Sequence, residues 1–132
     1  MKDLKIMATI LLILCALTYC IPPPQSAESF ITKEGVDLGG LSPHIDVVLL
    51  EADSIWEEFG QEMVITAGLD GVHSVGSLHY LGLAVDLRTR YFTNEEKEVI
   101  AYKLQDALKK FNIHYQVVVH RTHIHVEYDI GS

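Results

Sequence analysis

The stretch "SLHYLGLAVDL", residues 77–87, places a histidine and an aspartate seven positions apart, where a loop runs into a short apolar segment. A second stretch, "VVHRTHIHVEY" at residues 118–128, carries three more histidines. Five of the seven histidines of the chain lie in or beside these two stretches. Because histidine is not a preferred core residue, we interpret the two stretches as parts of one site.

Hydrophobic periodicity predicts strands in and around both stretches. In residues 122–128 polar and apolar side chains alternate, which places His123, His125 and Glu127 on one face of a strand. Residues 114–119 read as a second strand, paired antiparallel with the first. Two further strands are expected at residues 62–68 and 82–88, separated by a glycine-rich loop at 69–77.

Two helices are predicted from their start signals and their apolar faces. Ser42 followed by Pro43 is a typical N-cap with proline in the first turn, and Thr93 with Glu96 forms a capping box. The apolar face of the first helix, which ends at Gly60, comprises Ile45, Val48, Leu49, Ala52, Ile55, Trp56 and Phe59. The apolar face of the second comprises Ile100, Leu104, Ala107, Leu108 and Phe111. The sequence therefore predicts a single domain of mixed α and β structure.

The N-terminal residues have the composition of an export signal. Lys2 and Lys5 flank an apolar run of sixteen residues at 6–21, which is shorter than the roughly 20 residues that span a bilayer. Three outcomes are open for residues 1–21: a cleaved signal, a lipoprotein signal acylated at Cys20, or an uncleaved membrane anchor that tethers the chain. Residues 22–29, "PPPQSAES", form a proline-rich spacer, and the domain is expected at residues 30–132.

Charge and cysteine content limit the ligands of the domain. The net charge of −8 argues against a nucleic-acid partner, because such a partner requires a basic face. Both cysteines, Cys15 and Cys20, lie in the apolar N-terminal run. The domain would therefore contain neither a disulfide nor a thiolate ligand, and any metal must be held by nitrogen and oxygen atoms.

The spacing of His79 and Asp86 allows both side chains to reach one point if the loop folds back on the strand. Together with a histidine of the last strand they would supply two imidazoles and one carboxylate with an open fourth position. Such a set is typical of a catalytic zinc site. A single histidine is usually a surface residue, and the H-x6-D spacing alone is common, so the indication comes from the combination.

The residues between these ligands bring a family resemblance. "SLHYLGLAVD" resembles the S-x-H-x-x-G-x-A-x-D motif of the zinc D-Ala-D-Ala carboxypeptidases, whose superfamily includes the hedgehog signalling domain. "HSVGSLHYLGLAVD" is similar to the hedgehog version, and "THIHV" is similar to its second zinc segment. The resemblance implies an α+β fold in which helices flank a small antiparallel sheet, and one zinc ion held by His79, Asp86 and His125.

The resemblance also implies catalytic roles. Many members carry E-x-x-H-x-H, where this chain reads H-x-x-H-x-H, so His120 takes the position of the general base. Neutral imidazole is a competent base near pH 7, and His123 could donate a hydrogen bond to the developing oxyanion. His123 as the base, and His120 as a turn residue facing solvent, remain alternatives. Gly82 and Ala84 would let the backbone pass close behind the metal.

The sequence gives weaker indications of the residues that bind the substrate. The superfamily often has an arginine in the loop where this chain has Leu69 and Asp70. The residues that could replace it are Arg88, Arg90 and Arg121, and His73 and Ser77 are further candidates for contact with the substrate. Each has a plain alternative, as a loop, turn or surface residue.

The sequence therefore leaves two alternative functions. The first is an exported, periplasmic or cell-surface zinc peptidase that hydrolyses peptidoglycan stem peptides at or near D-alanine. The second is a non-catalytic zinc-binding interaction module of the hedgehog type. The scissile bond and the oligomeric state stay open at this stage.

Overall fold

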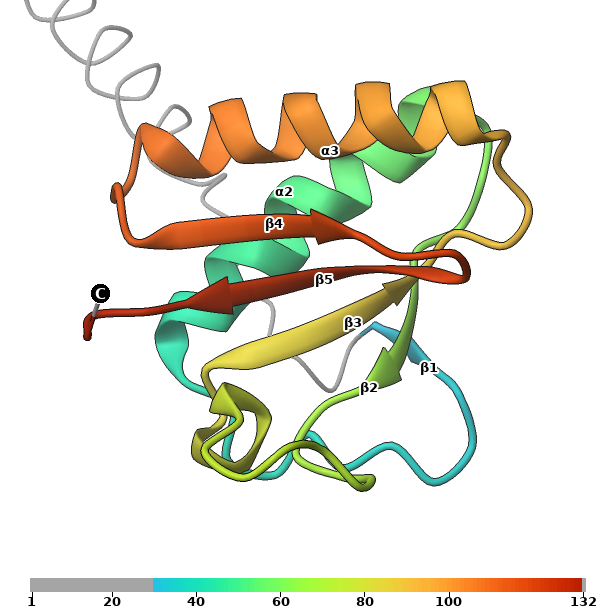
Figure 1. Cartoon of the computed structure of the whole chain (residues 1–132). Coiled ribbons are helices and arrows are strands. Elements are labelled where there is room, and N and C mark those ends of the chain that lie inside the picture. The colour runs from blue at the N-terminus through green and yellow to red at the C-terminus, as the bar shows by residue number, and fades with distance from the viewer. Residues whose placement is uncertain (1–29, 132) are drawn as a thin grey trace, which may run out of the picture.

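The computed structural model describes residues 30–131 (Figure 1). In chain order the elements are β1 (Ile31–Thr32), α2 (Pro43–Glu58), β2 (Val64–Ala67), the short 3-10 helix η2 (Leu78–Leu81), β3 (Ala84–Arg88), α3 (Asn94–Lys109), β4 (Tyr115–Val119) and β5 (His123–Tyr128). Within these residues the strands form one five-stranded sheet in the order β1-β2-β3-β5-β4. None of the described helices has the length and apolar character needed to cross a bilayer. The predicted export segment, the spacer and both cysteines lie outside the described residues.

The predicted α+β class is confirmed, but the sheet is mixed rather than antiparallel. Neighbouring strands from β2 to β4 pair antiparallel, whereas β1 pairs parallel with β2. Parallel pairing requires a long connection between the two strands, which α2 provides. Because β1 has two residues and both are exposed, it has no alternation that the sequence could have revealed.

Both helices pack against the same face of the sheet, rather than flanking it on two sides (Figure 1). Val85 and Leu87 of β3 are fully buried on this face, as are Ile124 and Val126 of β5. They share one core with the apolar faces of α2 and α3. Neither α2 nor α3 covers the opposite face of β3 and β5, and this is the face that carries the polar side chains of both strands.

The start of each helix is confirmed as predicted. The hydroxyl of Ser42 accepts a hydrogen bond from the backbone N–H of His44 at 3.3 Å. Thr93 and Glu96 form the reciprocal capping box, with distances of 3.2 Å and 2.8 Å. The assignment of Phe111 to the core face of the second helix is wrong. The helix ends at Lys109, so the helical periodicity no longer applies, and the Phe111 side chain is 59% exposed.

The register between β3 and β5 places the two polar stretches together. Asp86 lies directly opposite His125 in the antiparallel pair. Alternation along β5 is confirmed, because Ile124, Val126 and Tyr128 are buried on the other face. A slip of one residue would turn every side chain of β5 to the wrong face. Burial of the apolar side chains therefore holds the polar ones in line.

A buried lysine connects α3 to the turn between β4 and β5. Lys97 is 6% exposed, and its Nζ donates a hydrogen bond to the carbonyl of Arg121 at 2.7 Å. Lys97→Met keeps the apolar stem but leaves this carbonyl without its partner. We expect the free energy of unfolding to fall by about 1–3 kcal/mol, measured by chemical denaturation. The control is Lys103→Met, which removes a half-exposed ion pair with Glu58 and should cost at most about 1 kcal/mol. Equal losses in the two variants would contradict the role of the buried contact.

Candidate metal centre

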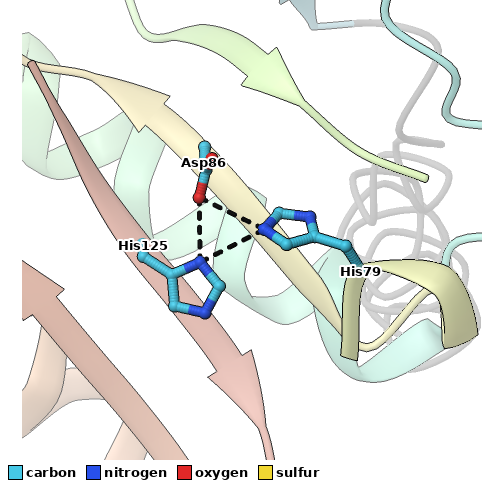
Figure 2. Close-up of side chains that lie close together, drawn as sticks. All are labelled: His79, Asp86 and His125. Carbon is cyan, nitrogen blue, oxygen red and sulfur yellow. Dashed lines mark hydrogen bonds and ion pairs between the residues drawn. The ribbon is translucent and has the colours of Figure 1, made fainter. Parts of the chain in front are cut away.

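His79, Asp86 and His125 converge on the open face of the sheet, and each offers one ligand atom within 4.8 Å of the others (Figure 2). Asp86 Oδ1 lies 3.3 Å from His79 Nε2 and 2.9 Å from His125 Nδ1. The two imidazole nitrogens are 3.2 Å apart. Three donor atoms on η2, β3 and β5 thus face one another. This group could hold a metal ion.

The backbone around η2 places His79. The hydroxyl of Ser77 caps the helix and accepts a hydrogen bond from the backbone N–H of His79 at 3.4 Å, which favours the turn role considered for this serine. Gly82 ends the helix with a left-handed φ of 67°. A Cβ at Gly82 would lie 2.2 Å from the carbonyl oxygen of Gly40. Glycine is required here by its backbone conformation and by the close approach of Gly40, rather than by space behind a metal.

The imidazole of His79 is fixed on its far side. The residue is 2% exposed, and Nδ1 lies 2.7 Å from the carbonyl of Gly68, to which it donates. The ring of His73 stacks on that of His79, with centroids 3.9 Å apart. Because Nδ1 carries the proton, Nε2 presents its lone pair toward Asp86 and His125.

The electrostatics of the group favour a cation between its members. Burial acts to raise the pKa of the Asp86 carboxyl, but hydrogen bonds with His125 and His79 outweigh it and hold that pKa well below its usual range. The hydrogen bond to Asp86 raises the pKa of His125, and Glu127 adds to this effect. Asp86 therefore stabilises the protonated form of His125 when no metal is bound. A divalent ion would take the place of that proton.

An open cleft of about 670 Å³ contains the three ligand residues. Its walls also include His120, His123 and the loop that leads into η2. Among the lining residues are therefore five of the seven histidines of the chain, His73, His79, His120, His123 and His125. Residues of both histidine-bearing stretches therefore line one cleft.

The two candidate catalytic histidines lie side by side in this cleft. The rings of His120 and His123 stack with centroids 4.6 Å apart, and the ring of His120 lies 6.3 Å from that of His125. His123 Nε2 is 3.6 Å from Asp86 Oδ2, and its Nδ1 is 3.3 Å from the hydroxyl of Thr122. Burial lowers the pKa of His123, so this imidazole is neutral near pH 7.

None of the three candidate arginines, Arg88, Arg90 and Arg121, lines the cleft. Arg88 shares the open face of β3 with Asp86, and its register partner is His123. Arg121 is exposed in the turn between β4 and β5. At the position where the resemblance leads one to expect an arginine, Asp70 instead accepts hydrogen bonds from the backbone N–H groups of Asp37 and Gly68, each at 2.9 Å. Its role in this loop is structural.

Two contacts of the site were missed by sequence reasoning. The carbonyl of Gly68 contacts His79 across a loop of ten residues, and no local signal indicates this. Glu127 Oε2 lies 3.0 Å from His125 Nε2. The alternation of β5 placed Glu127 on the correct face, and that signal could have been used to assign it a role.

Metal binding at this site should weaken as the pH falls. The raised pKa of His125 means that the metal-free site holds a proton more tightly than free histidine does, and a metal ion must displace this proton. Asp86, with its lowered pKa, is already deprotonated over the neutral range. We expect the zinc affinity to decrease steadily from about pH 8 to about pH 6. Isothermal titration in buffers of different ionisation enthalpy would also detect release of the proton. A zinc affinity that does not change with pH would contradict this.

The donor set of the site, two imidazole nitrogens and one carboxylate oxygen, suits a first-row divalent metal such as zinc. No family model matches this chain, and no curated protein matches it. The function is therefore inferred from the residues of the cleft and from their geometry.

Proposed function

We propose that this chain is a zinc-dependent peptidase that hydrolyses peptidoglycan stem peptides at or near D-alanine, with a domain of the hedgehog and D-Ala-D-Ala carboxypeptidase type. One observation carries the proposal: His79, Asp86 and His125 converge in a cleft that also holds two further imidazoles. A site that only stabilised the fold would have no need of additional titratable groups beside its ligands. The two sequence motifs supply the class of substrate, through the family resemblance.

The ligand residues fit zinc in number and in chemistry. His79 would bind through Nε2, His125 through Nδ1 and Asp86 through its carboxylate. Three protein ligands are typical of a catalytic zinc, which keeps a further position for water or substrate. Zinc in such a site polarises a carbonyl group and lowers the pKa of water to about 7.

The two remaining histidines fit complementary roles in proton transfer. The Thr122 hydroxyl can donate to Nδ1 of neutral His123, which leaves the Nε2–H of this ring directed into the cleft as a donor. Such a donor suits the developing oxyanion. His120 is exposed and stacks on His123, so it can exchange protons with solvent. This arrangement supports His120 as the general base.

The cleft is also suited to an extended peptide. It is open to solvent and has a volume within the range of about 300–1,000 Å³ that is usual for small-molecule sites. We propose that the chain is exported by its N-terminal segment and acts outside the cytoplasmic membrane. The proline-rich spacer at residues 22–29 would let an anchored domain reach successive stem peptides.

Digestion of purified peptidoglycan tests the proposal. Muropeptides would be incubated with the zinc-loaded chain, and mass spectrometry would identify the bond that is cleaved. We expect products shortened at or next to a D-alanine. A chain that binds one zinc ion but releases no product from stem peptides would contradict the peptidase proposal and favour the non-catalytic zinc-binding module.

A further inference from the structure

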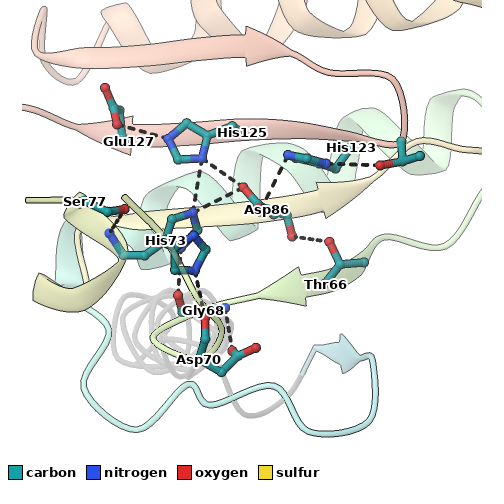
Figure 3. A network of polar contacts seen from close by, with 11 residues as sticks. Thr66, Gly68, Asp70, His73, Ser77, Asp86, His123, His125 and Glu127 are labelled. Carbon is teal, nitrogen blue, oxygen red and sulfur yellow. Dashed lines mark hydrogen bonds and ion pairs between the residues drawn. The ribbon is translucent and has the colours of Figure 1, made fainter. Parts of the chain in front are cut away.

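Glu127 contacts a ligand of the candidate metal centre from the side away from the other two. Its Oε2 lies 3.0 Å from His125 Nε2, while Nδ1 of the same ring lies 2.9 Å from Asp86 Oδ1 (Figure 3). The side chain of Glu127 is 24% exposed and lines the cleft. One imidazole is thus held between two carboxylates, with a different nitrogen facing each.

We propose that Glu127 is a positioning residue for the metal, and that its carboxylate holds His125 in the tautomer and ring orientation in which Nδ1 is the ligand atom. In neutral imidazole only one nitrogen carries a proton. When Nε2–H donates to Glu127, the lone pair is on Nδ1, which faces Asp86 and His79. The inference rests on the metal site of the proposed function, but not on peptidase activity.

The arrangement of His79 supports this assignment, because the same logic applies there with a different acceptor. Nδ1 of His79 donates to the Gly68 carbonyl at 2.7 Å, which leaves Nε2 for the metal. The far nitrogen of each histidine is therefore occupied, and the near nitrogens meet 3.2 Å apart. Acceptors of this kind behind metal-bound histidines fix the ring and raise its basicity.

The surroundings of Glu127 leave this as its main interaction. Among residues 30–131, Glu127 forms one ion pair, which is with His125. Its register partner on β3 is Ala84, whose side chain is small. Glu127 and Asp86 are both anionic and flank the same ring. Like charges placed so close together raise the energy of the site unless a cation lies between them. Glu127 therefore also increases the demand of the site for a positive ion.

The test uses zinc itself as the probe and the full 132-residue chain in detergent. The parent chain, Glu127→Gln and Glu127→Ala would be titrated with zinc in competition with a chelator. We expect Glu127→Ala to lose about 10–100-fold in zinc affinity. Glu127→Gln should lose less, because its amide oxygen still accepts from Nε2–H but no longer carries charge. The matched control is Asp129→Asn, which removes another carboxylate from the same cleft without a contact to a ligand histidine and should stay close to the parent chain.

Nitrogen NMR of the histidine rings gives a second readout that does not depend on activity. In the zinc-loaded parent chain the proton of His125 should reside on Nε2, and in Glu127→Ala this proton should exchange faster with water. Zinc affinity of Glu127→Ala equal to that of the parent chain, with an unchanged Nε2–H signal, would overturn the inference. A parent chain without zinc affinity would overturn it together with the metal site. A parent chain that binds zinc but hydrolyses no peptide would contradict the peptidase proposal alone, and the affinities of the variants would then still decide the role of Glu127.

Discussion

His125→Ala should lose the metal centre, and with it all hydrolysis that depends on the metal. Nδ1 of His125 is the nitrogen closest to Asp86 Oδ1, and it also faces His79 Nε2. Removal of this ring leaves two ligands, which cannot retain zinc against a chelator. Loss of a hydrogen-bond partner behind a metal ligand lowers the metal affinity by up to about 100-fold. Loss of the ligand itself should therefore lower it by more than about 100-fold. Elemental analysis of the purified chain should fall from about one zinc ion per chain toward zero.

A matched control separates this effect from a general loss of structure. His114→Ala removes a histidine that lies against Tyr128 and outside the cleft, so the zinc content of this variant should equal that of the parent chain. The fold of His125→Ala should persist, because the neighbouring Ile124 and Val126 remain buried on the opposite face of β5. Circular dichroism would confirm this. One full equivalent of zinc in a folded His125→Ala chain would rule out the assignment of this residue as a ligand.

Short-range signals were sufficient to predict the elements that carry the site. The capping box at Thr93 depends on a residue three positions away, and alternation in β5 depends on neighbouring residues. His79 and Asp86 are also close in the sequence, because His79 lies in the 3-10 helix η2 and Asp86 lies in β3, the strand that follows it. Local propensity and periodicity act over such distances. The third ligand, His125, was expected only through the family resemblance, because it meets Asp86 across two strands that are far apart in the sequence.

Features that depend on contacts distant in sequence could not be predicted in this way. Gly82 is required because its backbone approaches Gly40, and Gly68 because a Cβ there would lie 2.2 Å from the carbonyl oxygen of Asp37. The parallel strand β1 has too few residues to produce a periodic signal. The role of Glu127 depends on the orientation of the His125 ring, which alternation along a strand does not specify. The sequence thus indicated the ligands, while their supporting contacts came from the fold.

His120→Ala should retain zinc and lose most of the hydrolytic rate. His120 is not one of the three residues whose ligand atoms converge, and its ring centroid lies 6.3 Å from that of His125. If His120 is the general base, its removal should lower kcat by about 10²–10⁴-fold, which is the usual contribution of general acid–base catalysis. Zinc content and stem-peptide hydrolysis would be measured on the same preparation. His114→Ala again serves as the control and should match the parent chain in both measurements.

The companion variant His123→Ala decides between the two stacked histidines. His123 directs Nε2 toward Asp86, and burial lowers its pKa, so its ring is suited to donate a hydrogen bond rather than to accept and carry a proton. We expect His123→Ala to reduce kcat as well, because the developing oxyanion loses a donor that is worth about 10²–10³ in rate. The pH profile of each variant distinguishes the roles, since only loss of the base removes the fall in kcat at low pH that the base causes. Near-parental turnover by His120→Ala would assign the base to His123, or would show that the zinc site activates water without help from either ring.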